Sequence, residues 1–160
     1  MRKRDVMTGF VILALSVSGC SGGRSGSEAG SAPTRAALPG AASGAASAKE
    51  AVEVFMRAVK AQDLQTMSAV WGTVKGPARE QMEREELEKR LIIIQCKLDH
   101  LSWSFLEDRP RLLAGGKQDF QVQLRDKQAQ ATTTFTTILG PSGRWFVEIV
   151  DMAPLSDFCR

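Results

Sequence analysis

The side chains best suited to acid–base chemistry in this sequence are Asp99 and His100, the latter being the only histidine. A histidine beside a carboxylate can act as a general base when both groups reach the same proton. Adjacent residues at the start of a strand point to opposite faces, however, so these two are poorly placed to act together. We therefore interpret His100 as a partly exposed histidine without a catalytic role.

No other catalytic pattern occurs in the sequence. It contains no Gly-x-Ser-x-Gly nucleophile turn, no glycine loop of the phosphate-binding type and no His-Glu-x-x-His metal motif. Four carboxylates lie near predicted turns or on mixed strand faces, and we interpret them as solvated: Asp119, Asp126, Glu148 and Asp151. We therefore predict no catalytic residue, no metal and no cofactor.

The amino-terminal residues have the layout of a secretory signal peptide. Arg2, Lys3 and Arg4 form a positive segment, and residues 6–17 form an apolar one. The alternative is a transmembrane anchor. Such an anchor needs roughly 20 apolar residues, whereas this run ends after about a dozen.

The tetrapeptide Val17-Ser18-Gly19-Cys20 resembles the lipobox of bacterial lipoproteins. In that family the cysteine thiol carries a diacylglyceryl group, the chain is cut just before the cysteine, and the new amino terminus is acylated. The resemblance implies that residues 1–19 are removed and that lipidated Cys20 holds the protein on a membrane, since several acyl chains bind more stably than one. Ser21 is similar to the signal for the outer membrane of Gram-negative cells, facing the periplasm. In a cell with one membrane the location would be its outer face.

The charge of the chain does not support nucleic acid as a partner. The whole chain is formally +3 with a pI of about 8.9, but part of that charge lies in the signal peptide. From Ala48 onward there are 16 basic and 16 acidic side chains, so this part is formally neutral. Residues 20–47 are dominated by Ser, Gly, Ala and Pro, and we expect a disordered linker spanning roughly 30 Å. Residues 48–160 are then one domain.

Cys96 and Cys159 remain as an even pair in an exported chain, where disulfides persist. We predict a bridge that closes a loop of about sixty residues and contributes roughly 4 kcal/mol of stability. The alternative is a pair of unpaired thiols, with Cys96 filling a helix end as a small hydrophobe.

Hydrophobic periodicity predicts three helices followed by a sheet. Residues 48–61 place Val52, Phe55 and Val59 on one stripe, Asp63 caps a second helix, and Gly76-Pro77 opens a third. After Asp99 the period becomes two, which predicts four antiparallel strands within residues 101–106, 119–125, 128–139 and 145–150. In the last strand we expect Trp145, Val147 and Ile149 on one face, and Phe146, Glu148 and Val150 on the other. The fold class is therefore α+β.

Residues 50–64, followed by Trp71 near the end of the second helix, resemble the opening of NTF2-like (cystatin-like cone) domains, and the order of elements through residue 151 is similar. The resemblance implies a curved four-stranded sheet that wraps around a long helix to form a cone. Six aromatic residues are candidates for lining a pocket in that cone: Phe55, Trp71, Trp103, Phe105, Phe120 and Trp145. The alternative, which we favour because the chain has no tyrosine, is that they form the core.

These features predict a membrane-anchored envelope lipoprotein whose domain is a noncatalytic binding or interaction module. Its partners would be the membrane, through acylated Cys20, and an envelope protein or a small apolar ligand. Two alternatives stay open. The domain could carry a small apolar ligand or lipid in its cone, or it could be a small-molecule enzyme of the isomerase or cyclase type that uses Asp99 or another carboxylate.

Overall fold

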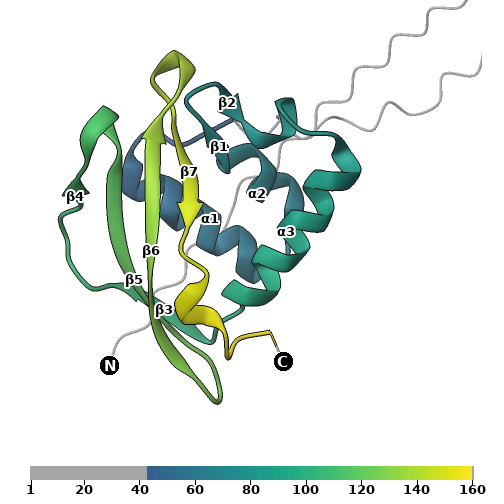
Figure 1. Cartoon of the computed structure of the whole chain (residues 1–160), viewed down its shortest axis with the longest axis vertical. Helices are drawn as coiled ribbons and strands as arrows, with labels where there is room; N and C mark the ends of the chain where they lie inside the picture. Colours follow the sequence, from purple (N-terminus) through teal and green to yellow (C-terminus); the bar gives the residue numbers. More distant parts are fainter. Residues whose placement is uncertain (1–42, 160) are drawn as a thin grey trace, which may run out of the picture. The chain divides into compact units, whose positions relative to one another are not determined.

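The computed structural model describes residues 43–159, all within one compact unit, Ala37–Arg160. The predicted signal peptide, Cys20 and most of the predicted linker lie outside the described residues. The helices are α1 (Ala48–Ala61), α2 (Leu64–Val70) and α3 (Arg84–Leu98), shown in Figure 1. The strands are β1 (Gly72–Thr73), β2 (Gly76–Pro77), β3 (Ser102–Phe105), β4 (Arg111–Leu112), β5 (Gln118–Arg125), β6 (Gln130–Leu139) and β7 (Trp145–Val150). Short 3₁₀ helices are η1 (Ala78–Glu80), η2 (Ala114–Gly116), η3 (Pro141–Gly143) and η4 (Ala153–Leu155).

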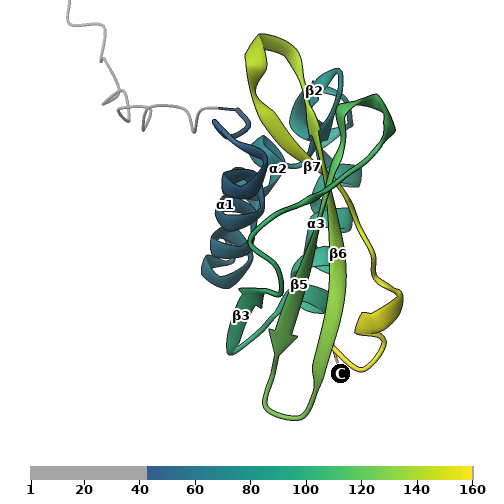
Figure 2. The same ribbon diagram turned by 90° about the vertical axis from the view of Figure 1, so that its left-hand side faces the viewer.

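The main sheet is antiparallel, with β3, β5, β6 and β7 in that order. β4 also pairs with β5, next to its Gln118 end, while β3 pairs with the Arg125 end. The sheet therefore has five strands, with β3 and β4 one after the other along the same edge of β5. The predicted number of four strands is wrong, because it omits β4. α1 contacts β6 and β7, and α2 and α3 pack beside α1 (Figures 1 and 2). The α+β class is confirmed.

α1 forms where the sequence predicts it. Ser47 caps its first turn by accepting a hydrogen bond from the Glu50 backbone N–H at 3.1 Å. The predicted stripe of Val52, Phe55 and Val59 is buried, with at most 2% of each residue exposed. The helix ends at Gln62, whose φ of 57° breaks the repeat.

The predicted start of the third helix is wrong. Gly76 and Pro77 form β2, which pairs with Gly72 and Thr73 of β1, and α3 begins only at Arg84. The hairpin needs a very close approach of its strands, because a Cβ on Gly72 would lie 2.3 Å from the Gly76 carbonyl oxygen. The Gly-Pro pair therefore makes a hairpin before the helix.

The predicted alternation in β7 is also wrong at its end. Thr136 pairs with Ile149, but Thr137 pairs with Val147, so Glu148 is the extra residue of a β-bulge. The bulge turns Val150, opposite Phe135, toward the core and leaves Ile149 with 53% of its surface exposed. Val147, before the bulge, is fully buried.

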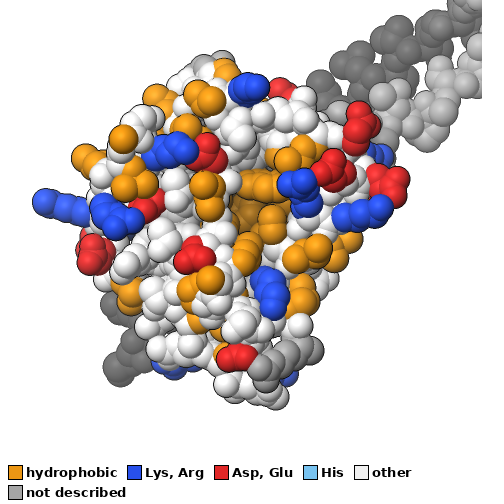
Figure 3. Space-filling model, in the orientation of Figure 1, with side chains coloured by type: hydrophobic (Ala, Val, Ile, Leu, Met, Phe, Trp, Pro, Cys, Tyr) orange, Lys and Arg blue, Asp and Glu red, His pale blue; other side chains and the backbone are white. Residues whose placement is uncertain are grey.

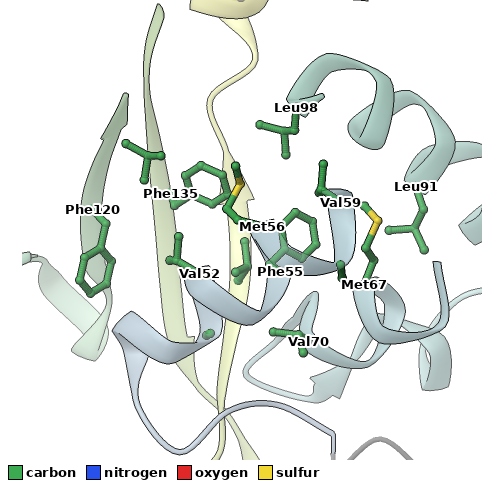
Figure 4. Close-up of a cluster of buried hydrophobic side chains, with 14 of the residues drawn as sticks. Val52, Phe55, Met56, Val59, Met67, Val70, Leu91, Leu98, Phe120 and Phe135 are labelled. Atoms are coloured by element: carbon green, nitrogen blue, oxygen red, sulfur yellow. The ribbon is translucent and has the colours of Figure 1, made fainter. Parts of the chain in front are cut away.

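The core lies between α1 and the sheet. Phe55 and Met56 from α1, Leu98 from α3, and Phe120 and Phe135 from the sheet meet there, as Figure 4 shows. Every residue of this core lies within residues 45–158. A chain that begins at residue 20 therefore keeps the whole core.

The C-terminal segment completes the core. Leu155 and Phe158 are at most 1% exposed, and Cys159 forms the predicted disulfide with Cys96 on α3. The Lys97 ammonium group donates hydrogen bonds to the carbonyls of Leu155 and Phe158 at 3.3 and 2.9 Å. This segment is attached to α3 by covalent, polar and apolar contacts together.

The packed structure begins before Ala48. Ala45 is 2% exposed and forms an antiparallel bridge with Trp145, and the Gly44 N–H donates to the Ala69 carbonyl at 2.8 Å. Residues 43–47, which the sequence assigns to the linker, therefore belong to the domain.

Candidate functional site

The candidate pocket aromatics do not enclose one cavity. Phe55 and Phe120 are buried in the core, and Phe55 packs edge-on against Phe135 with ring centres 6.4 Å apart. Trp103, Phe105 and Phe120 form a row, with successive ring centres 5.2 and 5.5 Å apart. Phe55 and Phe120 thus belong to the packed core, and the row continues from Phe120 to the half-buried rings of Phe105 and Trp103.

Trp71 and Trp145 lie along β7 instead. Trp71 forms a parallel bridge with Val147, and its indole N–H donates to the Glu148 carbonyl at 3.3 Å. Trp145 and Phe120 line a shallow hollow of about 250 Å³ at the start of α1. Lys49 beside this hollow lies 5.0 Å from the Phe105 ring centre and 3.8 Å from an Asp108 carboxylate oxygen. These contacts hold α1 against the edge of the sheet.

Asp99 and His100 each make structural contacts. His100 is 5% exposed, so its interpretation as partly exposed is wrong, and its Nδ1 lies 2.8 Å from the Leu98 carbonyl oxygen. A carbonyl only accepts, so Nδ1 carries the proton and donates it. The Asp99 side chain is solvent-exposed, accepts from the His100 backbone N–H at 2.9 Å and lies 3.9 Å from Lys60 Nζ. The two side chains form no acid–base pair.

Two carboxylates interpreted as solvated are largely buried. Asp119 is 7% exposed and accepts hydrogen bonds from Arg111 and from the Thr136 hydroxyl, both at 2.7 Å. The Glu148 carboxylate lies 2.6 Å from Lys117 Nζ. The Asp119 contacts join β5 to β4 and β6, and the Glu148 contact joins β7 to the residue just before β5. The interpretation of these two residues as solvated is therefore wrong, and their role is structural.

An open cavity of about 400 Å³ lies beside the disulfide; we call it the disulfide pocket. It forms where the ends of α1 and α3, the turn between β5 and β6, and the C-terminal segment meet. Its lining is polar except for Ile92 and the cystine: Gln62, Ile92, Gln95, Cys96, Asp99, Asp126, Lys127, Gln128, Asp157 and Cys159. Both half-cystines are exposed, as are Gln62 and Gln128.

The disulfide pocket offers recognition and no evident reaction chemistry. Its lining has three carboxylates against one lysine, and this excess of acceptor groups with negative charge suits a ligand or peptide that presents N–H groups. The two cysteines are joined, so neither supplies a thiol nucleophile. Within residues 43–159 no group of three His, Cys, Asp or Glu side chains is arranged to hold a metal ion. None of the helices described there is long and apolar enough to cross a bilayer.

The sequence contained one usable signal for this pocket. The predicted Cys96–Cys159 bridge places the end of α3 beside the C terminus. What brings Gln62, Asp126 and Gln128 to the bridge is the packing of α1 on the sheet. That packing depends on contacts distant in sequence.

Comparisons with known proteins add little to this site. The chain matches no protein-family model, and it matches no curated protein. Among solved structures, it is similar to an NTF-2-like protein of unknown function from Shewanella oneidensis MR-1, at 11% identity and a TM-score of 0.39. The match covers 64% of this chain and 92% of that one. A likeness this distant does not establish a family.

Proposed function

We propose that this protein is an envelope lipoprotein, anchored through acylated Cys20, whose NTF2-like domain is a noncatalytic binding or interaction module. The observation that carries the binding role is the contrast between a filled interior and an open polar pocket. Four of the six side chains expected to line a cone pack in the core or against one another, namely Phe55, Trp103, Phe105 and Phe120, while the disulfide pocket is open to solvent. The fold family is supported by the order of elements and by the packing of α1 on the antiparallel sheet.

A catalytic function is not favoured by the placement of the titratable side chains. The Asp99 carboxylate and the His100 imidazole each take a separate structural hydrogen bond, and Asp119 and Glu148 are occupied by basic partners. A general base needs access to a bound substrate. None of these four groups combines such access with a nucleophile nearby.

We propose the disulfide pocket as the binding site of the module, for a protein segment or small molecule that presents N–H donors. Ile92, with 54% of its surface exposed, supplies an apolar contact at the wall of this otherwise polar pocket. Binding sites commonly combine apolar area with a few polar groups that fix orientation.

The binding site can be tested by photo-crosslinking in the native host. A photoreactive amino acid at Gln128, which lines the pocket, should give a discrete adduct, and Ile92→Arg should abolish it. Ile93→Arg is the matched control, because Ile93 is the next residue of α3, is 63% exposed and does not line the pocket. Equal loss with both variants, or no adduct, would rule out this site.

Anchoring is tested separately. Cys20→Ala should release the protein from the membrane fraction and block cutting before residue 20. Unchanged membrane association and unchanged processing would refute the lipoprotein assignment.

A second candidate is a carrier of a small apolar ligand. Figure 3 shows a hollow floored by hydrophobic side chains between β7 and α3. A carrier should retain lipid through purification, and native mass spectrometry would detect it as added mass. A ligand-free mass would leave the interaction module as the better account.

A further inference from the structure

Three turns gather at one end of the domain, the upper end in Figures 1 and 2. They are residues 73–76 between β1 and β2, residues 112–117 between β4 and β5, and residues 139–144 between β6 and β7. We call these three turns together the loop end.

Contacts between the turns show that they form one surface. Lys75 and Gly76 of the first turn line a hollow of about 230 Å³ together with Pro141 and Arg144 of the third. The second turn is adjacent because Gln118, directly after it, pairs with Thr137, two residues before Leu139. In both ribbon views the three turns point the same way.

The loop end exposes four large aliphatic side chains. The exposed fraction is 75% for Leu112, 59% for Val74, 44% for Leu139 and 36% for Leu113. Single exposed aliphatic residues are common on soluble proteins, but a group of them on adjacent turns indicates an interaction surface. Hydrophobic side chains are seen along the upper margin of Figure 3, beside basic ones.

The charge of the three turns is positive. They contain Lys75, Lys117 and Arg144 and no carboxylate. Lys117 forms an ion pair with Glu148, whereas Arg144 donates hydrogen bonds to the backbone carbonyls of Ser43 and Gly44, which are uncharged. Within residues 43–159, no ion pair joins Lys75 or Arg144 to a carboxylate, although Glu80 lines the same hollow.

The chain joins the domain at this end. Ser43, the first described residue, lines the hollow with Lys75 and Arg144, and its carbonyl accepts from Arg144 Nε at 3.3 Å. The segment that leads back to Cys20 is thus attached at the loop end, within 23 residues of Cys20 by residue number (43 − 20). If Cys20 is in a bilayer, the chain that comes from the membrane enters the domain at the loop end.

We propose that the loop end docks on a phospholipid surface with anionic headgroups, with the exposed aliphatic residues inserted among the lipids and Lys75 and Arg144 beside the headgroups. Interfacial binding of this kind combines buried apolar area with attraction between basic side chains and anionic lipid. The orientation argument rests on the proposed attachment through Cys20, whereas the exposure and charge arguments do not. The disulfide pocket would face away from the membrane, because the β5–β6 turn that lines it is at the opposite end of the sheet.

The test uses residues 20–160 with Cys20→Ala, which removes both the lipid and the signal peptide and keeps the whole core. The probe is co-sedimentation with vesicles of phosphatidylcholine, with and without phosphatidylglycerol. We expect binding to the phosphatidylglycerol vesicles and weak binding to phosphatidylcholine alone. Leu112→Glu/Leu113→Glu should lower the partition coefficient about tenfold or more, and Lys75→Ala about fivefold.

The matched control is Ile93→Glu/Leu101→Glu, which adds the same two charges at exposed aliphatic residues outside both the loop end and the disulfide pocket. It should leave vesicle binding unchanged. Equal loss with both double variants, or no binding by the parent chain, would overturn the proposal. A concentration-dependent dimer that is lost with Leu112→Glu/Leu113→Glu would also overturn it, because a second copy would then occupy the surface.

Lys75→Ala keeps the test decisive if a double variant does not fold, since Lys75 is exposed and outside the core. The result is also independent of the anchor. If the parent chain binds vesicles but Cys20 is unmodified in cells, the proposed anchor is wrong and the docking surface stands. If Cys20 is acylated in cells but the parent chain does not bind vesicles, only the docking surface is wrong.

Discussion

Replacing Cys96 and Cys159 together by serine tests how the C-terminal segment is held. The disulfide links residues 63 apart in the sequence. In the entropic account of disulfide stabilisation, closing a loop of that length raises the free energy of the unfolded chain by about 4 kcal/mol. Because small domains have only about 5–15 kcal/mol of stability, the double variant should remain folded with a strongly lowered urea midpoint.

The structure also predicts what does not change. Leu155 and Phe158 are buried, and Lys97 binds backbone carbonyls of the same segment, so the segment should stay docked after the disulfide is removed. Phe158→Ala removes a fully buried ring and should cost about 3–5 kcal/mol in the oxidised protein. If the segment stays docked, Phe158→Ala should cost a similar amount of stability in the serine double variant.

The assay is a double-mutant cycle in which equilibrium unfolding by urea is monitored by circular dichroism. Additive effects, within about 0.5 kcal/mol, are expected if the disulfide acts on the unfolded chain alone. A cost of Phe158→Ala below about 1 kcal/mol in the serine background would refute the reasoning. It would mean that the disulfide, and not the apolar packing, keeps the segment in place. If the combined variant is too unstable, Phe158→Leu provides a milder test of about 1 kcal/mol.

Three further changes test local features. Two hydrogen bonds from Thr66 lower the pKa of Asp63 from its ordinary value of 3.8. The Thr66 hydroxyl has the larger effect and its backbone N–H the smaller. Asp63→Ala should therefore cost about 1 kcal/mol at neutral pH, and this cost should shrink as the pH falls below 3.8 and through the lower pKa of the folded state, measured as urea midpoints at several pH values. Gly72→Ala should cost about 1–3 kcal/mol by overpacking against the Gly76 carbonyl, and an unchanged thermal midpoint would contradict the hairpin. Asp119→Ala should cost about 1–3 kcal/mol, since it leaves two donors without their acceptor; a loss that disappears in high salt would instead indicate a screened surface contact.

The sequence predictions were accurate where the signal came from residues close together in the chain, and they failed where the outcome depended on packing between distant segments. α1 was predictable because Val52, Phe55 and Val59 recur at helical spacing. The start of α3 was not, since Gly76-Pro77 fits a helix start and a hairpin equally well until the close approach of Gly72 is known. β4 consists of Arg111 and Leu112 only, and a pair of residues cannot show alternation.

The faces of the sheet show the same limit. Alternation placed Val147 correctly, but the bulge at Glu148 reverses it and exposes Ile149. A bulge inserts one residue without a distinctive composition. The disulfide pocket and the loop end were likewise beyond sequence reasoning, because each joins side chains from at least three separate segments.

The central claim is that Cys20 attaches this domain to a membrane. Its most direct test is mass spectrometry of the amino-terminal peptide of the protein isolated from membranes. The account predicts a peptide that begins at Cys20 and has the added mass of a diacylglyceryl group and an amide-linked acyl chain. An unmodified Cys20, or an amino terminus upstream of it, would contradict the account.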